Sequence, residues 1–193
     1  MLVKNAVQAI VIGGSSGGVN AWFRIVSGLK NDFQIPLVVV LHQSRKSKSS
    51  MIELSQHRTK LKVKEPLDKE KLMSKTIYIA PPDYHLMLEK DLSFSYSFTE
   101  AVNYSRPSID VLFETAADAF QKNIVAVLLT GANADGAKGL KRIKETGGFT
   151  IVQNPADAES PVMQQAAIDL FTPDFIGNLD EIITLLNQLK YGG

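Results

Sequence analysis

Three side chains that could act together in nucleophilic catalysis follow apolar segments of this sequence. Ser15 lies in the glycine-rich stretch GGSSGG, directly after an apolar segment. His42 and Asp135 also follow apolar segments, which end at residues 41 and 129. A serine hydroxyl is a weak nucleophile and needs a base, commonly a histidine that a carboxylate orients. Ser15, His42 and Asp135 are therefore candidates for nucleophile, base and acid.

The elements that must position these side chains alternate along the chain. Near-continuous apolar segments without polar alternation predict strands buried on both faces, as in a parallel sheet. We expect strands at residues 7–12, 36–41, 76–80, 124–129 and 149–152, and helices at 18–29, 48–56, 108–120, 137–146, 162–170 and 179–190. This alternation predicts an α/β fold, a doubly wound and mainly parallel sheet with helices on both faces. A polar and apolar alternation near residues 84–99 predicts a small antiparallel hairpin.

In an open parallel sheet, functional groups gather at the carboxyl ends of the strands. Ser15, His42 and Asp135 should therefore lie along one edge. The stretch around Ser15 fits G-x-S-x-G, a tight strand-to-helix turn that exposes a nucleophilic oxygen. The backbone N–H of Ser16, at the start of the next helix, would then supply half of an oxyanion hole.

Other residues allow a structural interpretation. His57 follows a helical segment and is expected on the surface, whereas His85 could shape the site or bond a loop. Ser108 is expected to cap a helix, and Asp135 could itself be a helix cap. The basic residues 45–48 could attract an acidic partner, although a solvated loop is the simpler interpretation.

Several functional classes lose support from the sequence. The glycines match neither the G-x-G-x-x-G dinucleotide pattern nor the Walker pattern, which disfavours a nucleotide-dependent enzyme. A net charge of +1 gives no basic field for nucleic acid. The chain has no cysteine, so it forms no disulfide or thiolate site. Without a long apolar run or a signal-peptide layout, we expect a cytoplasmic protein of one domain over residues 1–193, not inserted in a membrane.

Five motifs together resemble the catalytic domain of CheB-type chemotaxis protein-glutamate methylesterases. The family patterns I-G-A-S-T-G-G, I-A-P-G-D-x-H, R-P-S-x-D-x-L-F and L-T-G-M-G-x-D-G-A correspond to residues 12–18, 79–85, 106–113 and 129–137, and Q-H-M-P is matched only at His42. In these matches Ser15 corresponds to the catalytic nucleophile of the family, and Asp135 corresponds to its catalytic acid. The resemblance covers nearly the whole chain.

The resemblance implies hydrolysis of glutamate methyl esters on the cytoplasmic helices of chemoreceptors, often with glutamine deamidation, and no metal or organic cofactor. Ser16 and Ala132 would hold the oxyanion, and Gly14 and Thr130 would line the site. Family members usually carry a receiver domain. Here the first catalytic strand starts within ten residues of Met1, so we expect a stand-alone form, an excised domain, or a domain regulated by a receiver-domain protein in trans.

The departures from the family patterns keep alternatives open. Leu41 replaces glutamine, Ala132 replaces methionine, and Gln43-Ser44 replaces Met-Pro. The family's G-M-P-R-E-A-I is reduced at residues 162–168. The pocket is therefore expected to be reshaped. One alternative is a catalytically degenerate binding or regulatory module of the same fold, and another is an esterase with a substrate outside chemotaxis.

Overall fold

A computed structural model describes residues 6–42 and 48–192. Seven strands form one parallel sheet in the order β3-β4-β2-β1-β7-β8-β9. They are β1 (Ala9–Gly14), β2 (Leu37–Leu41), β3 (Lys62–Lys64), β4 (Thr76–Ile79), β7 (Ile124–Leu128), β8 (Phe149–Gln153) and β9 (Phe175–Gly177). Strands β2, β4 and β3 lie on one side of β1, and strands β7, β8 and β9 lie on the other. The order in which the chain adds strands therefore reverses between β1 and β7, and open α/β sheets commonly place a site at such a point.

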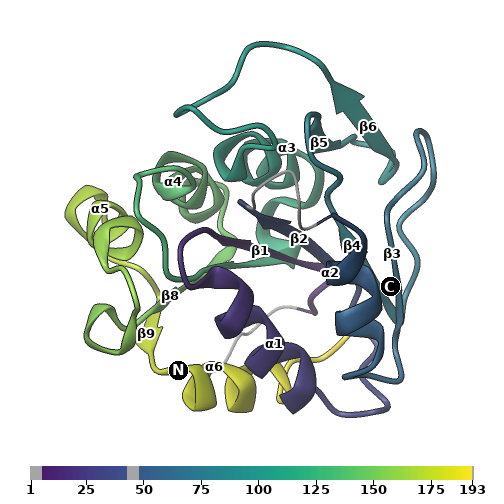
Figure 1. Cartoon of the computed structure of the whole chain (residues 1–193), viewed down its shortest axis with the longest axis horizontal. Helices are drawn as coiled ribbons and strands as arrows, with labels where there is room; N and C mark the ends of the chain where they lie inside the picture. The colour runs from purple at the N-terminus through teal and green to yellow at the C-terminus, as the bar shows by residue number, and fades with distance from the viewer. Residues whose placement is uncertain (1–5, 43–47, 193) are drawn as a thin grey trace.

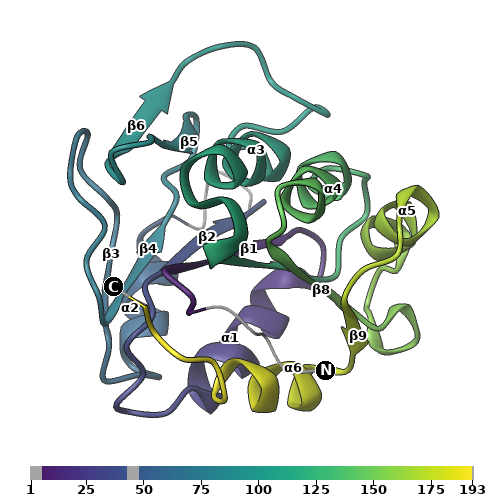
Figure 2. The ribbon, with the colours of Figure 1, turned by 180° about the vertical axis from the view of Figure 1, so that it is seen from behind.

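Among the described residues, six α-helices cover the two faces of the sheet (Figures 1 and 2). They are α1 (Gly18–Gly28), α2 (Lys48–Gln56), α3 (Ile109–Phe120), α4 (Ala137–Glu145), α5 (Val162–Leu170) and α6 (Leu179–Leu186). Helices α1, α2 and α6 share one buried apolar cluster, and α3, α4 and α5 share the other. Strand β1 contributes side chains to both clusters. Ile10 and Ile12 belong to the first cluster, and Ala9 and Val11 belong to the second. The predicted doubly wound fold is confirmed.

The antiparallel excursion predicted near residues 84–99 is also present. Strands β5 (His85–Leu88) and β6 (Phe94–Ser97) pair antiparallel, and β5 packs on α3. Two strands, β3 and β9, were not predicted. Each has only three residues and lies at an edge of the sheet, so neither has the continuous apolar run that marks a buried strand.

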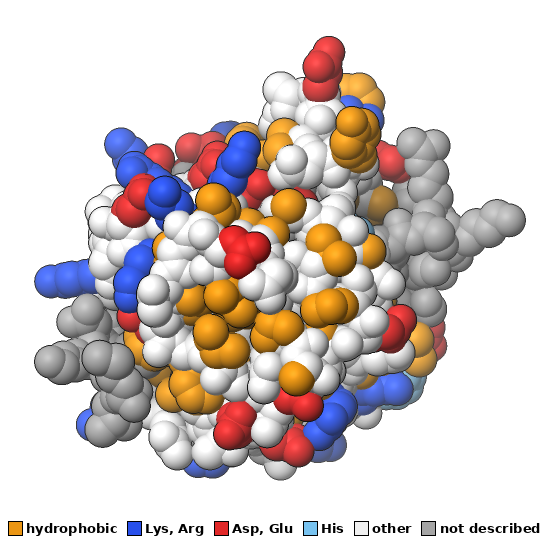
Figure 3. Space-filling view, turned by 90° about the vertical axis from the view of Figure 1, so that its left-hand side faces the viewer, with side chains coloured by type: hydrophobic (Ala, Val, Ile, Leu, Met, Phe, Trp, Pro, Cys, Tyr) orange, Lys and Arg blue, Asp and Glu red, His pale blue; other side chains and the backbone are white. Residues whose placement is uncertain are grey.

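The side of the molecule that carries α5 and β9 has an apolar surface. Figure 3 shows hydrophobic side chains gathered there, with most charged groups around the margin. Val162 and Leu170 of α5 and Ile176 of β9 are each more than two fifths exposed. In the described part of the chain, no helix is long and apolar enough to cross a membrane.

Candidate active site

The turn after β1 holds Ser15 at the carboxyl edge of the sheet. Ser15 N–H donates to Thr130 O at 2.9 Å, and Gly18 N–H donates to Ser15 O at 2.7 Å. Gly17 has a φ of 75°, a left-handed conformation that favours glycine. A Cβ atom at Gly17 would also lie 2.7 Å from the Glu159 side chain. The G-x-S-x-G turn is thus closed around a half-exposed Ser15.

The strand register brings Ser15 and His42 side by side. Gly14 and Leu41 form the last residue pair of β1 and β2, and His42 N–H donates to Gly14 O at 3.0 Å. Ser15 and His42 are the next residues on the two strands. No hydrogen bond between the Ser15 hydroxyl and the His42 ring occurs among the described contacts, however.

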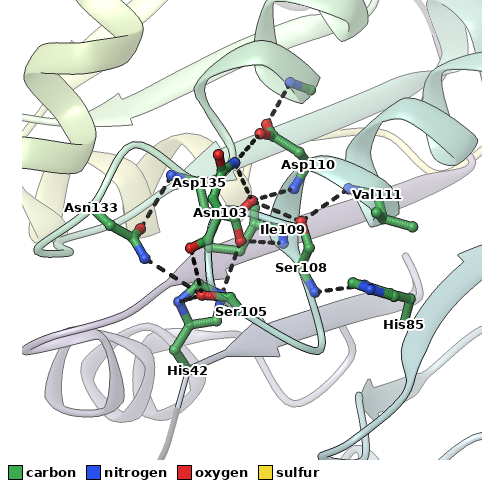
Figure 4. Close-up of polar contacts among 11 residues, drawn as sticks. His42, His85, Asn103, Ser105, Ser108, Ile109, Asp110, Val111, Asn133 and Asp135 are labelled. Atoms are coloured by element: carbon green, nitrogen blue, oxygen red, sulfur yellow. Dashed lines mark hydrogen bonds and ion pairs between the residues drawn. The ribbon is translucent and has the colours of Figure 1, made fainter. Parts of the chain in front are cut away.

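The His42 ring lies against Asp135 instead (Figure 4). Its Nε2 is 3.0 Å from Asp135 Oδ2, and the side chains are 14% and 0% exposed. His42 Nδ1 lies 3.3 Å from Ser105 Oγ. Since Nε2 faces the carboxylate, Nδ1 is the nitrogen left to exchange a proton with a hydroxyl group.

Asp135 is fixed by the first turn of α3 and the segment before it. Its carboxylate accepts hydrogen bonds from Ser108 Oγ (2.7 Å), Ile109 N (2.7 Å), Asp110 N (3.1 Å) and Asn103 Nδ2 (3.3 Å). Burial raises the pKa of Asp135, but the close contact with the His42 ring and the hydrogen bonds from Ile109 and Ser108 outweigh it and hold the pKa below its ordinary value. Asp135 is therefore an ionised, oriented partner for His42.

Ser108 and His85 support Asp135 without reaching the base. Ser108 caps α3 as predicted, since its Oγ accepts from Val111 N–H, and it also donates to Asp135. Ser108 N–H donates to His85 Nδ1 at 3.1 Å, so we assign the His85 proton to Nε2, 3.0 Å from Glu100 O. His85 lies on the far side of Ser108 from His42 in Figure 4. His85 therefore hydrogen-bonds the backbone of the segment that precedes α3 and does not act on the base.

A second carboxylate lies beside Asp135. Asp110 accepts from Gly139 N–H at 2.7 Å and from Asn103 Nδ2 at 2.9 Å. Burial, followed by the charge of Asp135, raises the pKa of Asp110 to about 6, although the Gly139 bond opposes the rise. Asn103 donates to both carboxylates. Two neighbouring acids thus have pKa values shifted in opposite directions.

The other predicted site residues lie in the same loops. Gly14 is buried at the end of β1. Ser16, in the turn after β1, and Ala132, in the loop after β7, are exposed. Thr130 is 2% exposed, and its hydroxyl bonds Ser16 O and the Ser160 backbone, so it links loops and does not line an open site. Among the described residues, the backbone N–H groups of Ser16 and Ala132 have no hydrogen-bond acceptor. Both are free to face a ligand.

A pocket of about 200 Å³ opens beside His42. Its lining is mixed: Leu41, Ile52, Ile79 and Pro82 contribute apolar surface, and Glu65 and Arg106 contribute charged groups. Leu41, which departs from the family pattern, is part of this wall. The other departure beside His42, Gln43-Ser44, lies outside the described residues, as do the side chains of the basic run 45–48.

Asn103 and Ser105 were not predicted as site residues, because they come from a turn that has no sequence pattern of its own. His57, by contrast, is exposed as expected just after α2, and its Nε2 lies 3.9 Å from Glu53 Oε1 of that helix. No group of three His, Asp or Glu side chains that could hold a metal ion exists within residues 6–42 and 48–192.

Comparison with known proteins identifies the family. The model of the CheB methylesterase family matches residues 10–186. A Leptospira interrogans protein, described provisionally as a protein-glutamate methylesterase/protein-glutamine glutaminase, is 46% identical over 182 residues, which cover 94% of both chains. The protein-glutamate methylesterase/protein-glutamine glutaminase 1 of Carboxydothermus hydrogenoformans is 36% identical, and the match covers 88% of this chain but only 52% of that protein.

A solved structure extends this comparison to the fold. The CheB methylesterase catalytic domain of Thermotoga maritima superposes with a TM-score of 0.89 at 29% identity. The alignment covers 95% of this chain and 99% of the Thermotoga chain. The helices and the parallel sheet described above are therefore those of a known catalytic domain. The chain belongs to the CheB methylesterase family.

Proposed function

We propose that this chain is a serine hydrolase that converts glutamate methyl esters in a protein substrate to glutamate and methanol. The observation that carries the proposal is the 3.0 Å contact between His42 and the buried Asp135, next to the exposed turn of Ser15. An imidazole oriented by a carboxylate and adjacent to a serine is the arrangement that activates a hydroxyl nucleophile. Family membership supports the same reaction.

In the proposed reaction, Ser15 Oγ forms a bond to the ester carbonyl carbon while its proton passes to His42 Nδ1. The charge of Asp135 stabilises the imidazolium. The bond to the methoxy group then breaks, and His42 returns the proton to the departing oxygen, which leaves as methanol. Water attacks the glutamyl ester on Ser15 with His42 again as base, which releases glutamate and restores the serine.

The oxyanion of the tetrahedral intermediate needs two N–H donors. Ser16 N–H and Ala132 N–H are the proposed donors, because both lack an internal acceptor among the described residues. Ser16 also precedes α1, whose N-terminus favours negative charge. Glutamine deamidation would follow the same steps with ammonia as leaving group.

The proposed substrate is the methylated cytoplasmic helix region of chemoreceptors, which places the enzyme in the cytoplasm. A receiver-domain protein in trans stays a prediction. We propose the apolar surface over α5 and β9 as the surface to which such a receiver-domain protein would bind, because exposed apolar patches commonly mark interaction sites.

A serine-directed fluorophosphonate tests the chemistry, with the adduct located by mass spectrometry. We expect labelling at Ser15 in the wild type and none in His42→Ala, since the serine depends on its base. A well-folded wild-type protein that is not labelled would instead support the binding or regulatory module. Release of methanol from methylated receptor fragments, compared with simple methyl esters, would separate the chemotaxis substrate from other esterase activities.

A further inference from the structure

His42, the base of the proposed triad, contacts Ser105 and not the proposed nucleophile Ser15. Ser105 Oγ lies 3.3 Å from His42 Nδ1, and no hydrogen bond joins Ser15 to the ring among the described contacts. Because Asp135 lies at Nε2, a neutral ring carries its proton there and leaves Nδ1 as an acceptor. Nδ1 then requires a donor, and the Ser105 hydroxyl is the group in place.

The backbone that carries Ser105 is a tight, strained turn. Val102 N–H donates to Ser105 O at 3.1 Å, and Ser105 N–H donates to Val102 O at 2.8 Å. The two central residues, Asn103 and Tyr104, have φ values of 48° and 62°, a left-handed conformation that is unfavourable for tyrosine. Strain of this kind persists where surrounding contacts impose it, commonly at functional sites.

This turn places one polar side chain on each partner of the acid–base pair. Asn103 donates to the carboxylates of Asp135 and Asp110, and Ser105 contacts His42. Figure 4 shows Ser105 beside the His42 ring and Asn103 beside Asp135. Tyr104, the residue between Asn103 and Ser105, is fully exposed.

Asn133 supports the direction of the Ser105 hydroxyl. Its amide Nδ2 lies 3.5 Å from Ser105 Oγ, while its Oδ1 accepts from Asp135 N–H at 3.1 Å. An amide that donates to Ser105 Oγ leaves the hydroxyl proton for an acceptor, either His42 Nδ1 or the more distant Asn103 O at 3.4 Å.

We propose that Ser105 is a positioning residue that holds Nδ1 of His42 in the resting protein and competes with Ser15 for the base. Substrate must displace the Ser105 hydroxyl before Ser15 can transfer its proton. The contact itself is independent of catalysis, whereas its kinetic consequence rests on the proposed function.

Nitrogen NMR of histidine-labelled protein tests the contact directly. We expect Ser105→Ala to move the His42 Nδ1 resonance toward that of an imidazole without a hydrogen bond. Ser15→Ala should leave the resonance in place, and Ser105→Thr, which keeps the hydroxyl, should keep it near the wild-type position. A resonance that moves in Ser15→Ala and not in Ser105→Ala would overturn the proposal.

The rate of fluorophosphonate labelling at Ser15 tests the competition. Removing a hydrogen bond that holds the base should make Ser105→Ala react about fivefold faster than wild type, with Ser105→Thr close to wild type. A slower or unchanged rate in Ser105→Ala would refute the competition. If Ser15 is labelled in no variant, the proposed hydrolase fails, but the NMR result still decides whether Ser105 holds His42.

Discussion

Two adjacent carboxylates show how local contacts assign different roles to the same side chain. Asp135 accepts four hydrogen bonds besides contacting His42, and these lower its pKa despite burial. Asp110 is also buried but accepts fewer bonds and lies close to the charge of Asp135, and its pKa is raised. The acid that contacts the base is thus kept ionised, while the pKa of its neighbour is raised to about 6, so that this neighbour takes up a proton in mildly acidic solution.

Replacing Asp135 with asparagine should abolish most of the activity. An amide cannot stabilise the imidazolium of His42, so we expect labelling at Ser15 to slow by about 10³- to 10⁴-fold. Both oxygens of Asp135 accept hydrogen bonds from the first turn of α3, so the NH₂ group of the asparagine must face a donor there in either orientation. This loss of a hydrogen bond should lower the free energy of unfolding by about 1–3 kcal/mol. Labelling rates and urea unfolding measure the two effects. A variant with full activity would remove Asp135 from the triad.

Asp110 should make the stability depend on pH in the opposite sense to an ordinary ion-paired acid. Its pKa rises from 3.8 unfolded to about 6 folded, so between these values the folded state binds more protons. Stability should therefore fall as pH rises from about 4 to 6, by on the order of 2–3 kcal/mol in total. The stability from Asp135 is lost only at lower pH, because its folded pKa lies below 3.8.

Asp110→Asn isolates this contribution. Urea unfolding of wild type and variant at pH 4.5 and 7.5 should show that the variant gains stability relative to wild type at the higher pH. Equal differences at the two pH values would mean that Asp110 titrates normally in the folded protein.

At the scale of residues, the sequence predicts the triad candidates better than their surroundings. Ser15, His42 and Asp135 each follow an apolar strand, so the rule for parallel sheets places them at one edge. Asn103 and Ser105 reach the same place through a turn with positive φ values at non-glycine residues, which no sequence pattern indicates. Asp110 was visible only as part of a motif, because its burial depends on how α3 packs.

At the scale of elements, the register of β1 against β2 and β7 determines the geometry of the site. Gly14 pairs with Leu41 and Gly13 with Leu128, so the residues after all three strands meet at one level. Buried strands and amphipathic helices were predictable from apolar patterns, although the last helix ends at Leu186 and not at residue 190. Helix ends depend on local packing more than on pattern.

The close crossing of α3 and α4 should not tolerate a methyl group at Gly139. A Cβ atom there would lie 2.6 Å from Phe113 Cβ and 2.9 Å from Asp110 O, which are near or part of the backbone and cannot rotate away. Alanine gains about 1 kcal/mol in helix propensity over glycine. We nevertheless expect Gly139→Ala to destabilise the fold by about 1–3 kcal/mol through overpacking.

Gly18→Ala provides a matched control for stability in another helix. A Cβ atom at Gly18 would have its nearest neighbours at 3.5 Å, an ordinary contact distance. Urea unfolding should place this variant within about 0.5 kcal/mol of wild type. Equal effects at Gly18 and Gly139 would show that helix propensity, not the α3–α4 contact, governs both positions.

At the scale of the whole molecule, the two ends of β1 serve different purposes. Its carboxyl end leads into the Ser15 turn. Its amino end is tied to the C-terminal segment, because Val7 N–H donates to Lys190 O at 2.8 Å and Gly192 N–H donates to Val7 O at 3.1 Å. These bonds join segments that are distant in sequence. Contacts of the chain ends therefore stabilise the edge of the sheet opposite the candidate site.

Deleting residues 190–193 should separate stability from chemistry. The deletion removes both bonds to Val7 and its bridge to Tyr191, and at about 0.5–1.5 kcal/mol for each hydrogen bond we expect a loss of about 1–3 kcal/mol in unfolding free energy. The Ser15 turn, His42 and Asp135 contact none of the deleted residues among the described interactions, so labelling of the folded protein at 25 °C should proceed at the wild-type rate. A labelling rate that falls while the protein remains folded would show that β1 transmits the state of its amino end to the nucleophile.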